Sequence, residues 1–295
     1  MIYLYIFAGL LLLVVIWIYL EKKIIVKSEY TIKSGGKGIV SGGFTFAIIA
    51  DLHNTGFGTG NKRLLQKICK INPDFVIIAG DLITKRKPCY PGCAYDLIKE
   101  LSFRYPVYYA YGNHEQTFED MENNPVTDQA DNELVKSWTE FKSNLVELGV
   151  QILDNKSITI KYKDNTINIT GLSIDSGFYI RGNPPKLEQE DIVGKIGRRG
   201  EGYQILIAHN PIYFKDYVKW GADLVLSGHV HGGLVRLPFV GGLISPQVRL
   251  FPRYDAGLFE ESGSYMVVSR GLGSHSFMPR MFNPPELVVI DLKAG

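Results

Sequence analysis

The chain has 295 residues, of which 45% are hydrophobic and 21% charged, a composition that excludes a largely disordered protein and allows one large domain or two small ones. Its 32 basic and 30 acidic residues nearly cancel, so no general electrostatic attraction to nucleic acid is expected. The odd number of cysteines, three, argues against a disulfide framework.

The first element along the chain is an uninterrupted apolar run over residues 2–20. A helix of this length reaches about 28 Å, close to the hydrocarbon thickness of a bilayer. A buried core helix is one alternative, but a helix that is apolar on every side needs protein packed all around it, and at the N-terminus this one has nothing yet to pack against. A cleaved signal peptide is another, but no Lys or Arg precedes the run and no small-residue cleavage site follows it. We therefore expect residues 1–21 to form a single transmembrane anchor.

Basic residues follow this run and set its expected orientation. Lys22, Lys23, Lys27, Lys33 and Lys37 all lie on its C-terminal side. The positive-inside tendency then predicts a single-pass protein of the cell membrane whose remaining chain is cytoplasmic. Five glycines among residues 28–43 predict a short strand followed by a flexible stretch, so residues 22–43 are expected to form a juxtamembrane linker.

From residue 44 onward, short apolar runs alternate with helical patterns. The runs over residues 44–50, 75–80, 107–111, 204–208 and 223–227 are mostly continuous, which is typical of strands buried on both faces. Helical spacing appears over 61–71 and 131–148, with Gly149 as a C-terminal stop. Three later runs, at 167–172, 265–269 and 287–291, are assigned to a second sheet. The pattern predicts an α/β domain over residues 44–292 with helices outside two sheets.

Polar side chains stand where five of these runs end, which is where α/β sheets bind ligands. Five of the chain's six histidines belong to this set. Its members are Asp51, His53, Asp81, Asn113, His114, Glu115, His209, His229 and His231. Alone, each piece is commonly structural, since Asp-x-His is often a surface pair and Gly-Asp often a turn. Several carboxylates and imidazoles buried together need a shared cation, so their joint occurrence indicates a metal site.

The types of side chain narrow the metal. Carboxylates, imidazoles and one amide, without a thiolate, favour Mn²⁺, Fe²⁺, Co²⁺ or Zn²⁺, and we take Mn²⁺ as the leading candidate. The number of side chains exceeds what one ion needs in an open catalytic geometry. Two divalent ions that share a bridging carboxylate, roughly 3.5–4 Å apart, fit the set better.

The order of the polar pieces resembles the signature of the calcineurin-like metallophosphoesterase superfamily. The pieces are D-x-H at 51–53, G-D at 80–81, G-N-H-E at 112–115, a His at 209 and G-H-x-H at 228–231. Phe57-Gly58, the run LSGHVHGG at 226–233 and Asn-Pro-Pro-Glu at 283–286 resemble its membrane-associated bacterial phosphodiesterase branch. The resemblance covers about residues 44–292 and implies a four-layer α-β-β-α sandwich.

The resemblance also implies a role for each position. It implies that a first metal ion is held by Asp51, His53 and His231. It implies that a second ion is held by Asn113, His209 and His229, and that Asp81 bridges the two ions. His114 would be a general acid or transition-state stabiliser beside the substrate phosphate, and Glu115 would orient its loop. Two cations would lower the pKa of a bridging water, and the resulting hydroxide would attack the phosphorus of a phosphodiester or related phosphate bond.

Two positions depart from related phosphoprotein phosphatases. Tyr111 stands where they carry an Arg, and Thr84 stands where they carry an Asp that helps to orient the catalytic His. A protein phosphatase is therefore disfavoured, and the sequence leaves open what orients His114.

Three hypotheses for function follow. The first is a metal-dependent phosphoric ester hydrolase, whose anchor favours a lipid-linked or membrane-derived substrate. The second is a membrane-surface pyrophosphatase acting on a lipid-linked nucleotide, because UDP-diacylglucosamine pyrophosphatases of the same broad family act at membranes. The third is a non-catalytic metal-binding protein on the same fold, although all seven candidate ligands are present. The near-neutral charge and the anchor argue against a nuclease, so no nucleic-acid partner is expected.

Three features outside the motif set have two interpretations each. Arg270 and Arg280 could reach a substrate phosphate or pair at the surface, and His275 could border the substrate or be a solvated loop residue. Residues 235–251 mix large apolar side chains with Gly and Pro, and they could contact lipid or form a packed loop.

Overall fold

The computed structural model describes residues 1–85, 92–124, 128–162, 164–180, 182–233, 236–237, 241–244, 250–274 and 280–295. His275 and residues 235, 238–240 and 245–249 of the apolar stretch named above lie outside the described residues.

Helices, short 3-10 turns and strands alternate along the chain. The helices and turns are α1 (Ile2–Glu21), η1 (Thr59–Asn61), α2 (Lys62–Ile71), α3 (Gly92–Ser102), α4 (Asn113–Asn123), α5 (Gln129–Glu147), η2 (Ser176–Tyr179), α6 (Gln189–Ile196), η3 (Pro211–Tyr213) and α7 (Phe214–Trp220). The strands are β1 (Val26–Lys33), β2 (Gly43–Ile49), β3 (Phe75–Ala79), β4 (Val107–Ala110), β5 (Gln151–Ile152), β6 (Ser157–Tyr162), β7 (Asn165–Leu172), β8 (Tyr203–Ala208), β9 (Leu224–Ser227), β10 (Arg236–Leu237), β11 (Gly241–Gly242), β12 (Gly257–Glu261), β13 (Ser264–Val268) and β14 (Glu286–Lys293).

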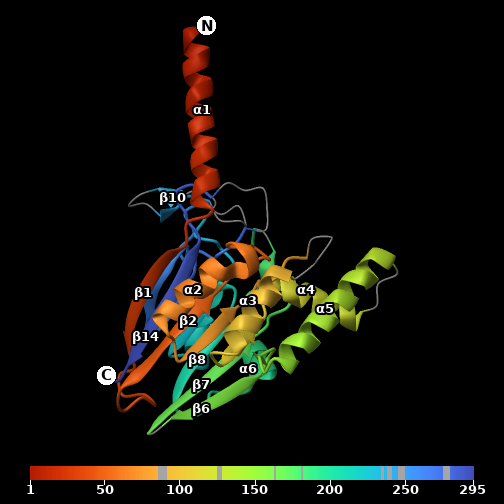
Figure 1. Cartoon of the computed structure of the whole chain (residues 1–295). Helices are drawn as coiled ribbons and strands as arrows, with labels where there is room; N and C mark the ends of the chain where they lie inside the picture. The colour runs from red at the N-terminus through yellow and green to blue at the C-terminus, as the bar shows by residue number, and fades with distance from the viewer. Residues whose placement is uncertain are drawn as a thin grey trace.

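Two six-stranded sheets form the centre of the molecule. The first has the order β1-β14-β2-β3-β4-β5, and the second has the order β12-β13-β9-β8-β7-β6. Strands β2 to β5 are parallel to one another, as are β7, β8, β9 and β13. Because these parallel strands point the same way within each sheet, their carboxyl ends gather at one edge (Figure 1).

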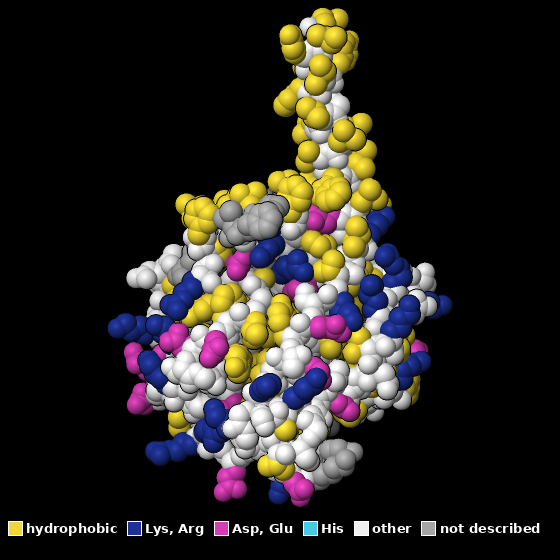
Figure 2. All heavy atoms as spheres, turned by 90° about the vertical axis from the view of Figure 1, so that its left-hand side faces the viewer, with side chains coloured by type: hydrophobic (Ala, Val, Ile, Leu, Met, Phe, Trp, Pro, Cys, Tyr) yellow, Lys and Arg dark blue, Asp and Glu magenta, His cyan; other side chains and the backbone are white. Residues whose placement is uncertain are grey.

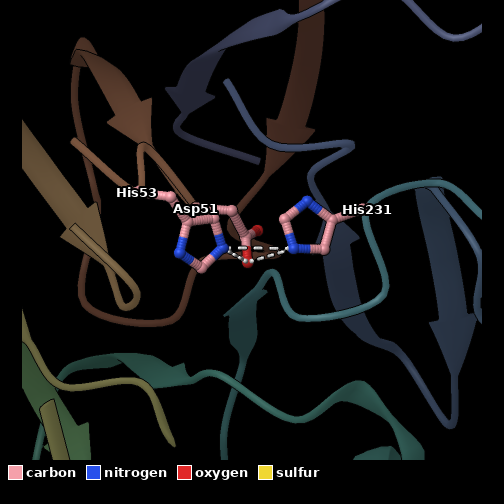
Figure 3. Close-up of side chains that lie close together, drawn as sticks. All are labelled: Asp51, His53 and His231. Carbon is pink, nitrogen blue, oxygen red and sulfur yellow. Dashed lines mark hydrogen bonds and ion pairs between the residues drawn. The ribbon is translucent and has the colours of Figure 1, made fainter. Parts of the chain in front are cut away.

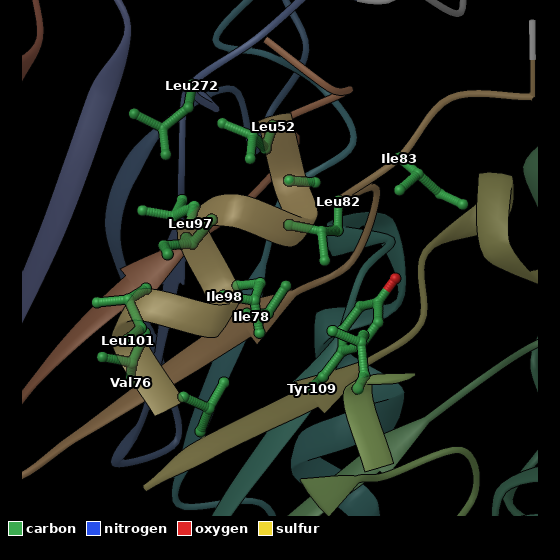
Figure 4. Packing of buried hydrophobic residues seen from close by; sticks show 14 of the residues in the cluster. Leu52, Val76, Ile78, Leu82, Ile83, Leu97, Ile98, Leu101, Tyr109 and Leu272 are labelled. Carbon is green, nitrogen blue, oxygen red and sulfur yellow. The ribbon is translucent and has the colours of Figure 1, made fainter. Parts of the chain in front are cut away.

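Alternation along the strands builds three apolar layers. In β2, Phe46 and Ile48 belong to the core between the two sheets, whereas Ala47 and Ile49 belong to the core beneath α2, α3 and α5. A third core packs α6 and α7 onto the second sheet. Figure 4 shows side chains of α3 lying over those of β3 and β4 in the helix-covered core. The predicted four-layer α-β-β-α sandwich is therefore confirmed.

One strand lies in a different sheet from the one predicted. Residues 287–291 were assigned to the second sheet, but β14 lies between β1 and β2 in the first, so that assignment is wrong. The strand is buried along most of its length. An apolar run of this kind indicates a central strand without indicating its sheet, because both sheets bury central strands.

The segment expected to be a linker contains an edge strand. β1 pairs with β14 in parallel over its whole length, from Val26 opposite Glu286 to Lys33 opposite Lys293. Its side chains alternate between exposed and partly buried, which suits a strand with one face toward solvent. The structure therefore ties this segment to the first sheet immediately after α1.

Helix α1 projects from the edge that holds the strand ends. β1 is parallel to β14, and β14 is antiparallel to β2, so the first residue of β1 and the last residue of β2 lie at the same edge. Figure 1 shows α1 extending away from that edge. Among the described residues, α1 alone is long and apolar enough to cross a membrane.

Candidate metal centre

Five strand ends bring the predicted polar residues together. Asp51 follows β2, Asp81 follows β3 and Asn113 opens α4 after β4. From the second sheet, His209 follows β8, and the loop after β9 supplies His229 and His231. The facing edges of the two sheets thus supply all seven candidate metal ligands.

Three of these side chains form a first cluster. The Nε2 atoms of His53 and His231 lie 3.2 Å apart, and the Oδ1 atom of Asp51 lies 3.8 Å from the former and 3.4 Å from the latter. Figure 3 shows both rings pointing toward the carboxylate between them. All three side chains are buried, so water screens their charges little.

A second cluster contains Asp81, which also lies close to His53 of the first cluster. The Oδ2 atom of Asp81 lies 3.2 Å from His209 Nε2 and 3.8 Å from His53 Nε2, while its Oδ1 atom accepts a hydrogen bond from the backbone N–H of His114. Asp81, His209 and His229 place ligand atoms within 4.8 Å of one another. One oxygen of Asp81 is therefore held by the backbone, and the other faces both clusters.

The donor atoms fit a pair of divalent cations. Ligand atoms about 2.1 Å from a shared ion lie roughly 3–3.5 Å apart, which matches the shortest separations between the clustered atoms. Within the described part of the chain, the Oδ1 atom of Asn113 is buried and has no hydrogen-bond partner. A buried amide oxygen of this kind is costly unless it meets a donor or a cation.

The backbone around the centre is strained. Five of the seven candidate ligands have a positive φ, namely Asp51, His53, Asp81, His229 and His231, with values of 47–68°. Left-handed backbone costs roughly 1–2 kcal/mol for a residue with a Cβ atom, and such residues cluster at functional sites. The fold therefore holds these side chains in positions that relaxed strands would not give.

Glycines in the motifs allow close approach to the two carboxylates. A Cβ atom on Gly112 would overlap the Asp81 carboxylate, and one on Gly228 would overlap that of Asp51. These glycines thus have a steric reason to precede Asn113 and His229.

Burial and mutual attraction shift the titration of the centre. Burial raises the pKa of Asp51 to about 7. Burial would also raise the pKa of Asp81, but the positive charge of His209 holds it well below its usual range. Burial lowers the pKa of His209, yet the Asp81 carboxylate outweighs it and raises this pKa to about 10. The attraction that retains a proton here would equally attract a cation.

Hydrogen bonds at the far side of the imidazoles fix which nitrogen faces the centre. His209 Nδ1 lies 2.8 Å from the carbonyl oxygen of Ala79 and donates to it, which leaves Nε2 toward Asp81. In His114, Nδ1 accepts a hydrogen bond from the backbone N–H of Lys85 at 3.0 Å. The backbone N–H of Lys85 thus orients His114, a role that an Asp at the position of Thr84 has in related phosphoprotein phosphatases.

Glu115 orients the loops rather than facing the cluster. One of its oxygens accepts from the N–H groups of Asp81 and Gly112, both at 2.8 Å, and the other accepts from the N–H of Ile83 at 3.2 Å. Burial, with repulsion from Asp81, raises the pKa of this carboxyl to about 7. The role expected for Glu115 agrees with these contacts.

The structure adds residues that the motifs did not reveal. Tyr179 in η2 packs against His229 with ring centroids 5.0 Å apart, and it lies 6.4 Å from the ring of His209. Asn283 Nδ2 donates to the carbonyl oxygens of His231 at 2.6 Å and Gly233 at 2.9 Å. An isolated Tyr in a loop carries no sequence signal of this kind, although Asn283 lies in the Asn-Pro-Pro-Glu segment.

The remaining candidates have structural partners. Arg280 is buried and donates to the carbonyl oxygens of Arg270, Gly271, Gly273 and Asn283. Arg270 pairs with Glu286 at 2.9 Å, and Tyr111 packs its ring against Tyr109 and Trp138. These contacts favour roles within the fold over contact with a phosphate.

Comparison with known proteins links this geometry to one family. The family model for calcineurin-like phosphoesterases matches residues 44–233. The chain is 26% identical to the uncharacterised metallophosphoesterase YkuE of Bacillus subtilis over 94% of this chain and 88% of that protein. It is 27% identical to a transmembrane protein with a metallophosphoesterase domain from Danio rerio, over 85% of this chain and 53% of that one. It is also 23% identical to the UDP-2,3-diacylglucosamine pyrophosphatase LpxG of Chlamydia muridarum, over 78% and 77%.

Proposed function

Because the chain belongs to the calcineurin-like phosphoesterase family, we propose that it is a membrane-anchored hydrolase that cleaves phosphodiester or related phosphate bonds with two divalent metal ions. The position of Asp81 is the observation that carries this proposal. Its Oδ2 atom lies within 3.8 Å of imidazole nitrogens from both clusters, which suits a carboxylate shared by two ions.

The chain's own residues divide into two sets around that carboxylate. Two triads, Asp51 with His53 and His231, and Asn113 with His209 and His229, would each hold one ion, and Asp81 would contact both. When bound, the ions would supply an activated water and offset negative charge on the phosphate oxygens. Mn²⁺ suits this mixed oxygen and nitrogen set, as do Fe²⁺, Co²⁺ and Zn²⁺.

His114 acts as a donor toward the substrate. Because its Nδ1 atom accepts from Lys85, the proton of the neutral ring lies on Nε2. That Nε2 atom lies 3.9 Å from Asp81 Oδ2, on the side of the cluster. His114 therefore presents an N–H group that can hydrogen-bond to the phosphate or protonate the leaving oxygen.

Residues 1–21 anchor the protein, and the domain that follows lies on the cytoplasmic side. α1 carries no charged side chain from Ile2 to Leu20, and Lys22 and Lys23 follow it directly. The relative from Danio rerio is named as a transmembrane protein. Fusions at the C-terminus test the orientation. A fluorescent protein that folds only in the cytoplasm should be bright there, and an alkaline phosphatase that is active only after export should be inactive. The reverse result would contradict it.

A pyrophosphatase acting on a lipid-linked nucleotide is the second candidate function. The similarity to LpxG supports it, because that protein is named for hydrolysis of UDP-2,3-diacylglucosamine. Release of a nucleoside monophosphate from a UDP-linked lipid, without cleavage of simple diesters, would favour this candidate over a phosphodiesterase.

Hydrolysis of bis-p-nitrophenyl phosphate by the full chain in detergent tests the proposed function. The protein is first stripped with a chelator, then supplied with Mn²⁺, beside the monoester and an Asp81→Asn control. We expect Mn²⁺ to restore cleavage in the wild type and not in the control. Bound Mn²⁺ without turnover of the diester, the monoester or a lipid-linked pyrophosphate would contradict a catalytic role.

A further inference from the structure

The last turn of α1 carries residues that mark a membrane boundary. Trp17 and Tyr19 are exposed, and Lys22 and Lys23 follow within a few positions. The ammonium group of Lys23 lies 4.0 Å from the centre of the Tyr19 ring. Aromatic rings and lysines of this kind settle at the level of the lipid headgroups. The hydrocarbon region therefore ends beside this turn.

The domain surface touches α1 at that same level. The rings of Trp17 and Phe282 lie with centroids 6.2 Å apart. The Glu21 carboxylate accepts a hydrogen bond of 2.9 Å from the backbone N–H of Phe282. Two contacts thus join the end of the helix to the loop before β14, and Phe282 shares the depth of Trp17.

A group of exposed apolar side chains surrounds this junction. We call it the apolar shoulder, and it consists of Ile24, Leu237, Leu250, Phe251 and Phe282. Leu250 is 70% exposed and Phe251 63% exposed, and exposed apolar residues that cluster in this way mark an interaction surface, whereas single ones are ordinary. Figure 2 shows hydrophobic side chains gathered at the base of α1, whereas charged side chains are spread over the rest of that face.

Backbone hydrogen bonds hold the shoulder together. The N–H of Arg236 donates to the carbonyl oxygen of Met281, the residue before Phe282, which attaches the β10–β11 hairpin to the loop beside α1. The N–H of Phe251 donates to the carbonyl oxygen of Leu243, the residue after β11. Leu237 and Phe251 therefore belong to one structure that is fixed to the base of the helix.

We propose that the apolar shoulder inserts into the interfacial region of the bilayer, so that the domain rests on the membrane with its metal centre facing the lipid headgroups. This inference rests on the membrane anchorage in the proposed function. A lipid surface fits better than a partner protein or a second copy, because the shoulder is continuous with a helix whose boundary residues already define the depth of the lipid. Lys22, Lys23 and Arg63 lie beside it, and Arg63 donates to the carbonyl oxygen of Lys23.

The geometry connects the shoulder to the centre. Asn283, the neighbour of Phe282, donates to the carbonyl oxygen of His231, a member of the first cluster. The loop that rests on lipid and the loop that presents His231 are thus joined by one side chain. The site is thereby held at a fixed height above the bilayer, where the phosphate of a lipid headgroup lies, and a soluble ester gains nothing from this placement.

Quenching of tryptophan fluorescence by lipids brominated on their acyl chains tests this placement in the full chain. Phe251→Trp places a reporter on the shoulder. Phe103→Trp is the matched control, because Phe103 is 68% exposed and lies between α3 and the first residue of β4, at the opposite edge of the sheet. Trp138 and Trp220 are buried in the domain, so quenching of the native emission reports insertion of Trp17 at the end of α1 in every sample. Each variant is reconstituted in phosphatidylcholine–phosphatidylglycerol vesicles with and without the brominated lipid.

We expect the added emission of Phe251→Trp to be lost in brominated vesicles and that of Phe103→Trp to remain. If Trp17 is quenched and the Phe251→Trp reporter is not, α1 spans the bilayer while the shoulder stays in water or on another protein, and the proposal fails. If Trp17 is not quenched either, the proposal fails together with the anchorage. Quenching requires no turnover, so an inactive but quenched protein would contradict the proposed function and leave this inference standing.

A second pair of variants ties the surface to catalysis. Phe251→Glu should lower turnover of a phosphodiester lipid embedded in vesicles several-fold and leave turnover of soluble bis-p-nitrophenyl phosphate unchanged, because it opposes contact with lipid and not the chemistry. Phe103→Glu should change neither rate. Equal loss with both substrates in Phe251→Glu would mean damage to the fold or the site, and it would contradict a role in membrane contact.

Discussion

The core between the sheets and the candidate metal centre are built from the same strands. Within a few residues along such a strand, both the backbone conformation and the kind of buried side chain change. Along β2, Phe46 and Ile48 lie in extended backbone among other apolar side chains. Just past its end, Asp51 and His53 adopt left-handed backbone and bury charge. The first region stabilises the fold in any state of the protein. The second opposes folding until cations offset its charges, so stability and activity should respond to mutation in opposite ways.

Asp51→Asn should give the largest effect and the clearest contrast. Loss of one candidate ligand should lower turnover on the order of 10³-fold. Burial raises the pKa of Asp51 to about 7, so its ionised form is disfavoured in the folded protein without metal, and this cost is fully present above pH 7. Melting of the chelated protein at pH 8 should therefore move to a higher temperature in the variant. A lower melting temperature at that pH would break the comparison.

Ile77→Ala tests the other region. Ile77 is fully buried between the sheets, and its truncation should lower the free energy of unfolding by roughly 2–5 kcal/mol. Turnover per folded, metal-loaded molecule should stay near the wild-type value at a temperature where the variant remains folded. Denaturant unfolding measures the free energy of unfolding. Turnover divided by the amount of bound metal gives the activity per metal-loaded molecule. A large loss of turnover in the folded protein would show that core and centre are not separable.

His114→Ala sharpens the comparison within the centre. If His114 donates to substrate rather than holding metal, the variant should keep its metal content and lose roughly 10²-fold or more in turnover. Metal analysis after gel filtration separates this outcome from loss of a ligand. His114→Gln is a useful partner because its amide can still donate a hydrogen bond and should recover part of the rate. Loss of metal in both variants would place His114 among the ligands.

The pH dependence of metal affinity should give the smallest effect. In the metal-free protein the pKa of His209 is raised to about 10, so its ring is still protonated between pH 7 and 9. This proton must leave when a cation binds. One released proton makes the association constant rise about tenfold per pH unit between pH 7 and 9. The dependence should steepen below pH 7, where Asp51 is also protonated. Mn²⁺ titration at several pH values measures the slope, and a flat profile would contradict the protonated state of His209.

The sequence was sufficient to predict which residues cluster, because the carboxyl ends of parallel strands meet at one edge of a sheet. Asp81 and His209 are far apart in the chain, yet each directly follows an apolar run, and that rule placed both at the same edge. The two sheets could not be separated in the same way. β14 and β13 have similar apolar patterns, and only the path of the chain decides which sheet each joins.

The supporting contacts were beyond the reach of the sequence because they use backbone atoms. The N–H of Lys85 orients His114, and the carbonyl oxygen of His231 receives Asn283. Every residue other than proline has both of these backbone groups, so no side-chain pattern indicates which one lies beside the site. Tyr179 was missed for a related reason, since its contact with His229 depends on where a loop crosses the site.

The pairing of β1 with β14 has a consequence for the order in which the protein is made. Val26 leaves the ribosome with α1, but its partner Glu286 follows only 260 residues later. At about 5–20 residues per second, the edge of β1 waits on the order of 10–50 s before its neighbour is synthesised. Its exposed Lys27, Glu29 and Lys33 put charges on that waiting strand, and charge is a common protection against unwanted strand pairing. The first sheet is therefore complete only when β14 arrives next to β1.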